Sequence, residues 1–330
     1  MILPYLARLV CLALACFFLV HLALASGVSI LAPWILSVAN RMHPRFAAGV
    51  LFSARMFPLA GAVLAVAGMC VPSYLWLEPE GPVEEVGRLC LGAAALAVAI
   101  CGVSIGRGLR AVALSIRFER DSKHFGRETW FAGETTPVVV VDGAAGLLAL
   151  TGILRPRLVI SQEALSVLSA GQLAAALGHE RMHKTSRDNL KRLLLLVAPD
   201  ILPFRSPLAN GLKALVRGWT RSTELAADDG AVGGDSRRSV LLAEALVRVA
   251  RLGSATHQSP LMTSLVAEDC DLEARVERLL GPASGNERPA ARGPVLAAAT
   301  ALVAGFFLLA GFAAPASLQV AHRLLEHLVR

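Results

Sequence analysis

Leu177-Gly178-His179-Glu180-Arg181-Met182-His183 is the most informative stretch of this sequence. If the stretch is helical, His179 and His183 lie one turn apart on the same face, so that two imidazoles can bind one metal ion while Glu180 lies beside them. This arrangement is typical of a zinc hydrolase. The pattern is suggestive by itself, and a third metal ligand is needed to make it decisive.

The residues before this stretch predict the required helix. Ser169 and Gln172 have the spacing of an N-terminal capping box, and Leu173, Ala176 and Leu177 follow at helical intervals. The two histidines therefore fall well inside the predicted helix, where their positions are fixed by regular backbone.

A candidate for the third ligand follows on a second predicted helix, in the segment 221–228. Glu224 and Asp228 are four residues apart, so their carboxylates point the same way. Glu224 can reach the metal, and Asp228 can accept the free N–H of a metal-bound imidazole, which orients the ring. The alternative for Asp228 is an exposed helix carboxylate.

These residues together predict peptide-bond hydrolysis. One Zn²⁺ per chain, held by His179, His183 and Glu224, keeps a position for water and lowers the pKa of that water to about 7. Glu180 is the catalytic candidate, because it can take the proton from this water and later deliver it to the leaving amine.

The group that stabilises the oxyanion is not assigned by the sequence. His257 and Arg275 are weak candidates, and both tyrosines, Tyr5 and Tyr74, fall in apolar segments that we expect to be in a membrane. Arg221 could neutralise buried carboxylates or bind substrate, and a plain surface arginine is an equal alternative.

Composition places the chain at least partly in a lipid bilayer. Of its 330 residues 55% are hydrophobic, and the mean hydropathy is +0.58. The net charge of +7 is better explained by basic residues at a cytoplasmic membrane face than by nucleic-acid binding, because no aromatic and basic patch accompanies it. No two cysteines form a C-x-x-C pair, so no disulfide framework or cysteine metal site is expected.

Four apolar segments are long enough to cross a membrane, at residues 2–39, 46–77, 89–105 and 295–315. The first could instead be a cleaved signal peptide, because Ala23-Leu24-Ala25 resembles a cleavage site, but the apolar character resumes at Val28. Basic loops after the first and third segments, and acidic residues after the second, predict a cytoplasmic catalytic region at the inner membrane.

The polar region between the third and fourth segments has the size of one domain. The sequence therefore divides into a membrane domain with three transmembrane helices, a cytoplasmic zinc metallopeptidase domain, a fourth transmembrane helix and a short amphipathic tail, at residues 1–110, 111–292, 293–316 and 317–330.

Two or three short strands are predicted before the metal-binding helix, from the segments Pro137–Asp142, Leu147–Thr151 and Arg157–Ile160. Such a sheet can bind an extended substrate by strand addition, or it can simply support the helix. The apolar run at 193–204 is short for a span, so we expect it to pack against the domain or to lie at the bilayer surface.

The motifs resemble those of the BlaR/MecR-type membrane metallopeptidases, the family of beta-lactam-responsive receptors. The resemblance rests on the order of the spans and on His179-Glu180-x-x-His183, Arg187-Asp188-Asn189-Leu190 and Arg221-x-x-Glu224-Leu225-Ala226-Ala227-Asp228-Asp229. The related HtpX/CAAX-protease family shares the H-E-x-x-H and E-x-x-x-D pair, so the wider gluzincin group is indicated most firmly.

This resemblance implies an α-helical integral membrane protein with an α+β, zincin-like (gluzincin) cytoplasmic domain and about four transmembrane helices. It implies the zinc ligands His179, His183 and Glu224 and the catalytic Glu180, and regulatory cleavage of the chain itself or of a cytoplasmic transcriptional repressor. We expect no external penicillin-binding domain after the fourth span, which places beta-lactam sensing in doubt.

Two other functions remain open at this point. An HtpX-like protease would act in the quality control of membrane proteins. A non-catalytic membrane scaffold could use the metal for folding only, but a structural zinc site has no use for Glu180 and usually closes the fourth position with protein.

Overall fold

In the computed structural model, the described residues are 4–77, 86–131, 137–143, 146–202, 207–253, 261, 263–265 and 272–281. Three helices among them are long and apolar enough to cross a membrane: Tyr5–Ala39, Pro44–Trp76 and Arg88–Phe125. They coincide with the first three predicted spans. The fourth predicted span, the segment before it and the C-terminal tail lie outside the described residues.

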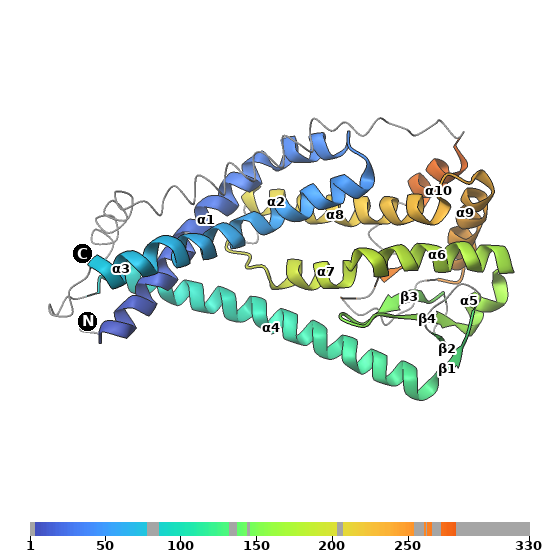
Figure 1. The fold of residues 1–330 in the computed structure, drawn as a ribbon, viewed down its shortest axis with the longest axis horizontal. Helices are drawn as coiled ribbons and strands as arrows, with labels where there is room; N and C mark the ends of the chain where they lie inside the picture. Colours follow the sequence, from blue (N-terminus) through green and yellow to red (C-terminus); the bar gives the residue numbers. More distant parts are fainter. Residues whose placement is uncertain are drawn as a thin grey trace.

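The first two spans form an antiparallel pair (Figure 1). Helix α1 (Tyr5–Ala39) leads through a short turn into α2 (Pro44–Ala65), which begins at a proline suited to the first helical position. A π-helical turn, η1 (Val66–Cys70), joins α2 to α3 (Val71–Leu77). The third span, α4 (Arg88–Phe125), runs as one helix past the expected domain boundary at residue 110 and ends where the sheet begins.

The sheet has five strands in the order β1-β2-β4-β3-β5. These are β1 (Arg127–Thr129), β2 (Val138–Val141), β3 (Leu148–Thr151), β4 (Arg157–Ser161) and β5 (Thr263–Ser264). Strands β2 and β4 are parallel, and the other neighbours are antiparallel. The three predicted segments correspond to β2, β3 and β4. Their side chains are buried on both faces of the sheet, which explains the continuous apolar runs.

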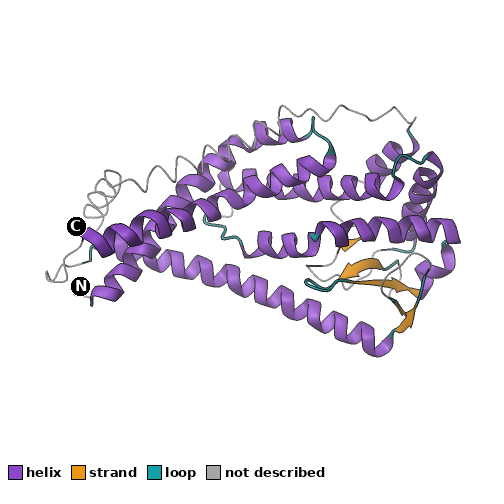
Figure 2. Ribbon diagram, in the orientation of Figure 1, coloured by secondary structure: helices purple, strands orange, loops and turns teal. Residues whose placement is uncertain are grey.

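Six helices complete the described part of the chain. They are α5 (Gln162–Val167), α6 (Ala170–Ser186), α7 (Asp188–Val197), α8 (Pro207–Val232), α9 (Ser236–Arg251) and α10 (Leu272–Leu280). Helices gather along the whole molecule, whereas the strands lie at one end of it (Figure 2). The described residues therefore form a mostly helical structure with a small mixed sheet.

Helix α8 joins the two halves of the molecule. Its first half contributes Leu215 and Trp219 to a core shared with α1 and α2, and its last turn packs on the core that α6 and α9 form with the sheet. A Cβ atom at Gly218 would come within 2.6 Å of the Cδ2 atom of Leu36, so a larger residue at this point requires the Leu36 side chain to move.

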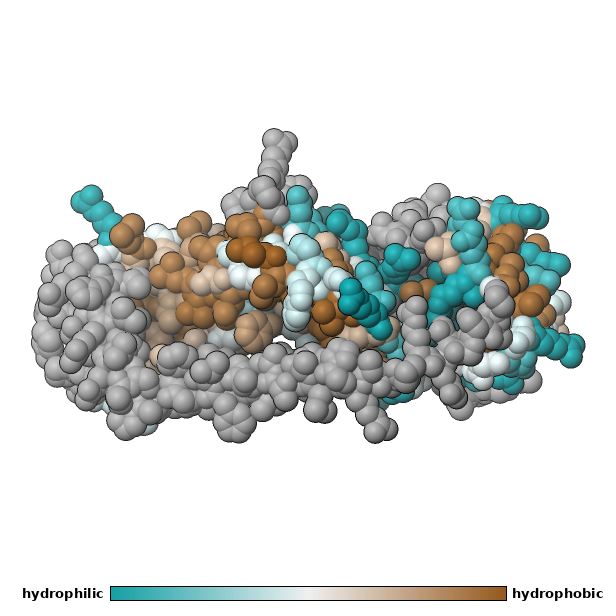
Figure 3. Space-filling view, turned by 90° about the horizontal axis from the view of Figure 1, so that it is seen from above, coloured by the Kyte–Doolittle hydropathy of each residue, from teal (hydrophilic) through white to brown (hydrophobic). Residues whose placement is uncertain are grey.

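The surface changes character along the long axis. In Figure 3 apolar side chains gather over the half that holds the membrane segments, and hydrophilic side chains are frequent over the half that holds the sheet. The described part of the apolar run at 193–204 is residues 193–202, at the end of α7 and directly after it, and Leu195 and Leu202 are buried in the core with α1 and α2. These residues therefore pack inside the molecule, whereas Leu194 is exposed.

Candidate active site

Helix α6 brings His179, Glu180 and His183 into the interior. Its N-terminus has the predicted capping box, in which Ser169 and Gln172 each bond the backbone of the other. The side chains of both histidines and of Glu180 are fully buried. The Nε2 atoms of His179 and His183 face each other at 3.1 Å.

Glu224 reaches the same point from α8. Its Oε2 lies 3.5 Å from Nε2 of His179, and its Oε1 lies 3.6 Å from Nε2 of His183. Ligands about 2.0–2.1 Å from a tetrahedral zinc ion are separated from each other by about 3.3 Å. Among the described residues His179, His183 and Glu224 form a group that could hold one metal ion, and their spacing fits zinc.

Two carboxylates orient the histidine rings. Oδ1 of Asp228 lies 2.9 Å from Nδ1 of His179, and Oδ2 of Asp188 lies 2.8 Å from Nδ1 of His183. An Nδ1–H that faces a carboxylate leaves the lone pair of Nε2 free for a metal. Arg187 makes the second contact possible, because its left-handed backbone (φ 54°) ends α6 and starts α7 with Asp188 turned toward the site.

Arg275 from α10 contacts the carboxylates of Asp228 and Glu224. Its Nε and Nη2 donate to Asp228 over 2.9 and 2.7 Å, and its Nη1 lies 3.2 Å from Oε2 of Glu224. Nη1 also donates to the carbonyl of Leu265 at 3.0 Å. The guanidinium is thus engaged by buried acceptors.

The charges of the site favour a cation. Burial raises the pKa of Glu180 to about 7, and neither oxygen of Glu180 has a hydrogen-bond partner among the described residues. Burial opposes the charge of His183, but Glu224 and Asp188 outweigh it and raise the pKa of His183 to about 10. Carboxylates that draw a histidine toward its charged form provide the potential that also attracts a metal ion.

Residues 131–283 match the model of Peptidase family M48. No curated protein and no solved structure matches the chain. The matched region contains both helices of the site, so it covers every residue placed around the candidate metal position. M48 peptidases are zinc metalloproteases, and the match supports a membrane zinc metallopeptidase broadly, with metalloprotease activity and protein or peptide substrates.

Asp188 and Asn189, in the M48-matching region, make contacts that the sequence analysis did not predict. The side-chain amide of Asn189 donates to the carbonyls of Leu150 and Gly152, at 3.1 and 2.8 Å, and so ties α7 to the end of β3. Asp188 and Asn189 follow His183 closely in the sequence, and this closeness is the only signal in the sequence that could have placed them near the site.

The weaker candidates from the sequence take other positions. Arg221 is exposed on α8, which agrees with a surface arginine. Tyr5 and Tyr74 pack on each other, with ring centroids 5.0 Å apart, between the membrane helices. His257 lies outside the described residues. Strands β2 and β3 each have two neighbours, so strand addition by a substrate would have to use β1 or β5, the outer strands of the described sheet.

Proposed function

We propose that the chain is an integral-membrane zinc-dependent endopeptidase. One observation carries the proposal: two imidazole Nε2 atoms and the Glu224 carboxylate converge within 3.6 Å of one another. The buried carboxylate of Glu180 lies on the same helical turn as the histidines and has no hydrogen-bond partner in the described part of the chain. In this proposal His179, His183 and Glu224 hold one Zn²⁺. Zinc, when bound, supplies a Lewis acid for the scissile carbonyl and lowers the pKa of a water molecule.

Glu180 is the proposed catalytic residue. A carboxylate with a pKa near 7 can accept a proton from the attacking water and return it to the leaving amine at neutral pH. Because both of its oxygens lack a partner among the described residues, nothing in that part of the chain competes for this proton. A structural metal site would not need such a group, which argues against a non-catalytic scaffold.

Asp228 and Asp188 are proposed to position the ligands. Each faces Nδ1 of one histidine, so each holds a ring in the tautomer that binds metal through Nε2. Arg275 compensates part of the buried negative charge through Asp228 and Glu224. These three residues act through the ligands and have no direct role in the proton transfers.

We propose that the catalytic region is cytoplasmic and that the protein resides in the inner membrane. Arg41, His43 and Arg45 lie in or beside the α1–α2 turn, and Arg107 and Arg110 lie in the second half of α4. Figure 1 shows this turn and the C-terminal end of α4 on the side that holds the sheet. Basic residues at one end of the spans favour the cytoplasm for that end. The division into domains at residues 110, 292 and 316 remains part of this proposal.

Regulatory proteolysis is the preferred role. The α1–α2 pair packs directly on α8, the helix that carries Glu224, through the core that includes Ala32, Leu51 and Leu215. A change in the membrane helices can therefore reach a metal ligand through packed side chains. This contact favours BlaR/MecR-like signalling, by cleavage of the chain itself or of a cytoplasmic repressor, over HtpX-like quality control.

The decisive test combines proteomics with metal analysis. Cells that express the native chain are compared with cells that express Glu180→Gln, and with cells that express Glu277→Gln as a control, because Glu277 is exposed on α10. We expect cleavage products that are absent only from the Glu180→Gln cells, while all three proteins contain one zinc per chain. Unchanged cleavage in Glu180→Gln would contradict the proposal.

A further inference from the structure

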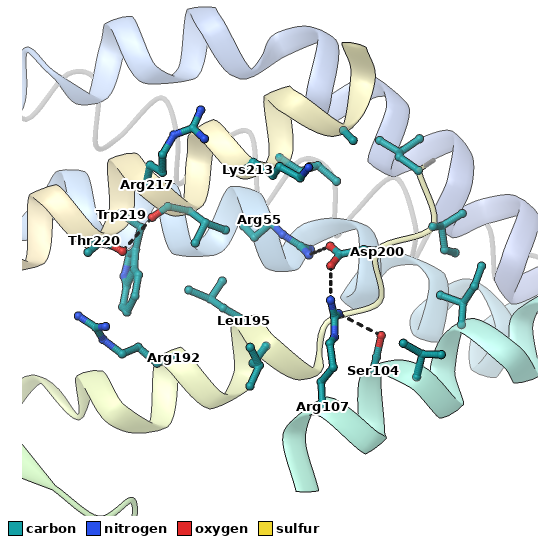
Figure 4. Close-up of a pocket in the computed structure, with 18 of the residues that line it drawn as sticks. Arg55, Ser104, Arg107, Arg192, Leu195, Asp200, Lys213, Arg217, Trp219 and Thr220 are labelled. Carbon is teal, nitrogen blue, oxygen red and sulfur yellow. Dashed lines mark hydrogen bonds and ion pairs between the residues drawn. The ribbon is translucent and has the colours of Figure 1, made fainter. Parts of the chain in front are cut away.

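A cavity of about 1020 Å³ lies between α2, α4, α7 and α8 (Figure 4). It adjoins the candidate active site, because Arg192 in its lining lies 3.8 Å from Glu224. Its lining combines apolar side chains with a marked excess of positive charge. Five cationic side chains and one carboxylate line it among the described residues: Arg55, Arg107, Arg192, Lys213, Arg217 and Asp200. The remaining lining is mostly aliphatic, from α4, α7 and α8. A cavity with this lining suits an anion that carries an apolar tail.

Asp200 accounts for only part of this positive charge. It accepts from Nη2 of Arg55 at 2.7 Å and from Nη1 of Arg107 at 2.9 Å, and Figure 4 shows it between the two guanidinium groups. Arg55 is 3% exposed, so its charge is almost completely removed from solvent. One carboxylate shared by two arginines leaves one excess positive charge beside the buried Arg55, on a pair in which Arg107 is 39% exposed.

Four buried donor atoms that have no acceptor among the described residues line this same cavity. They are Nη1 of Arg55, Nε of Arg107, Nε of Arg192 and Nε1 of Trp219. Trp219 is 2% exposed, so its indole N–H cannot be satisfied by bulk solvent. Buried donors are almost always paired in folded proteins, so unpaired donors that line one cavity indicate a ligand with several acceptor atoms. A phosphate group has such acceptors and the matching charge.

The position of the cavity relative to the apolar run of α4 indicates where this phosphate comes from. No charged residue occurs on α4 between Arg88 and Arg107. The cavity is lined by Ala99, Ile100 and Val103 from this run and by Arg107 at its end. It therefore extends across the level at which the hydrocarbon of a bilayer meets the headgroups. An acyl chain can contact the aliphatic part while a phosphate contacts the arginines.

We propose that this cavity is a binding site for the phosphate headgroup of an anionic membrane lipid. Arg192 connects the site to the candidate metal position: it packs over the Trp219 ring at 5.9 Å, and its Nη2 lies 3.8 Å from Oε1 of Glu224. The lipid would compete with Glu224 for this guanidinium. A bound lipid would therefore change the contact between Arg192 and Glu224, a proposed zinc ligand. Binding of the lipid can be measured whether or not the protein is a protease.

The test measures which lipid the full-length protein retains. The native chain is reconstituted into nanodiscs of phosphatidylglycerol and phosphatidylcholine in equal amounts, and the lipids that remain on the extracted protein are counted by mass spectrometry of the intact complex. We expect retention of phosphatidylglycerol in preference to phosphatidylcholine. The double variant Arg107→Gln/Arg217→Gln should bind phosphatidylglycerol about tenfold or more weakly.

The matched control is Arg110→Gln/Arg221→Gln, which removes two exposed arginines from the same two helices outside the cavity. It should retain the lipid as the native chain does. Thermal unfolding checks that each variant is folded, and Lys213→Gln serves in place of the first double variant if that protein does not fold. Equal loss in both pairs, equal retention of phosphatidylcholine, or no retained lipid overturns the proposal.

A last arm separates a lipid from other anions. Inorganic phosphate and a short peptide with a free C-terminal carboxylate are each added to the lipid-loaded protein. We expect neither to displace phosphatidylglycerol at millimolar concentration, because neither contacts the aliphatic part of the cavity. Complete displacement by phosphate would assign the cavity to a soluble anion, and complete displacement by the peptide would assign it to substrate; both results contradict the proposal.

Discussion

The candidate metal site and the basic cavity lie on the same helix, α8, and differ in charge and in access to solvent. The metal site is sealed, with His179, His183 and Glu224 all at 0% exposure, and carboxylates dominate it. The cavity is dominated by arginines and holds an Asp200 side chain that is 52% exposed. The sign of the excess charge identifies the ligand that each region suits: a cation in the first and an anion in the second.

The largest expected effect separates the chemistry of the metal site from its ability to bind metal. Glu180→Gln should lower the rate of peptide cleavage by about 10³-fold or more, because it removes the proposed base. Zinc content should remain at one per chain, since Glu180 is not among the proposed ligands. Activity is measured with a peptide library and zinc by atomic absorption, and a variant that cleaves at the native rate would refute the role of Glu180.

The two regions should also differ in what an arginine contributes to stability. Arg275→Met removes the partner of two buried carboxylates and should lower the free energy of unfolding by about 3–5 kcal/mol. Arg107→Met, in which the lost pair is 39% exposed on the arginine side, should lower it by at most about 1 kcal/mol. Thermal unfolding of both proteins in detergent measures the difference. A similar loss of unfolding free energy in Arg275→Met and Arg107→Met would contradict the expected difference between the metal site and the cavity.

The ring-orienting carboxylates should also affect metal affinity. Asp228→Asn should weaken zinc binding by about 10- to 100-fold, because the amide orients the His179 ring less well than the carboxylate. Asp188→Asn should have a similar effect through His183. Asp142→Asn is the control, because Asp142 is exposed. Competition with a chromophoric chelator measures the affinity, and an unchanged affinity in both variants would remove the positioning role.

The smallest expected effect tests how α8 is held against the membrane helices. Gly218→Ala should destabilise the protein by about 1 kcal/mol, because the added methyl group displaces the end of the Leu36 side chain. Gly27→Ala, in α1, has open space around the new methyl group and should be neutral or stabilising. The comparison uses thermal unfolding, and equal melting temperatures for the two variants would contradict the close α1–α8 contact.

The sequence predicted those parts of the structure that depend on local spacing. Each of these parts follows from the spacing or the apolar character of residues within one segment. They are the capping box, the helix that carries His179 and His183, the three long apolar helices and the strands β2, β3 and β4. The strands β1 and β5 were not predicted, because strands of three and two residues have no recognisable alternation. The structure brings all five candidate site residues together, and their roles remain proposals.

What the sequence did not predict depends on contacts between distant segments. Arg275 pairs with Asp228 because α10 packs beside the site, and nothing in the spacing of these residues indicates that contact. Asp188 faces His183 only because Arg187 adopts a left-handed conformation. The basic cavity did have a signal, since Arg55 is a charged residue inside a predicted span, and such residues commonly mark functional sites.

The most direct test of the account is X-ray absorption spectroscopy at the zinc edge of the purified full-length protein, combined with metal analysis. The account predicts one zinc per chain with two imidazole ligands and oxygen ligands, unchanged in Glu180→Gln and lost or altered in Glu224→Gln. A protein without zinc, or a zinc spectrum that Glu224→Gln leaves unchanged, would contradict it.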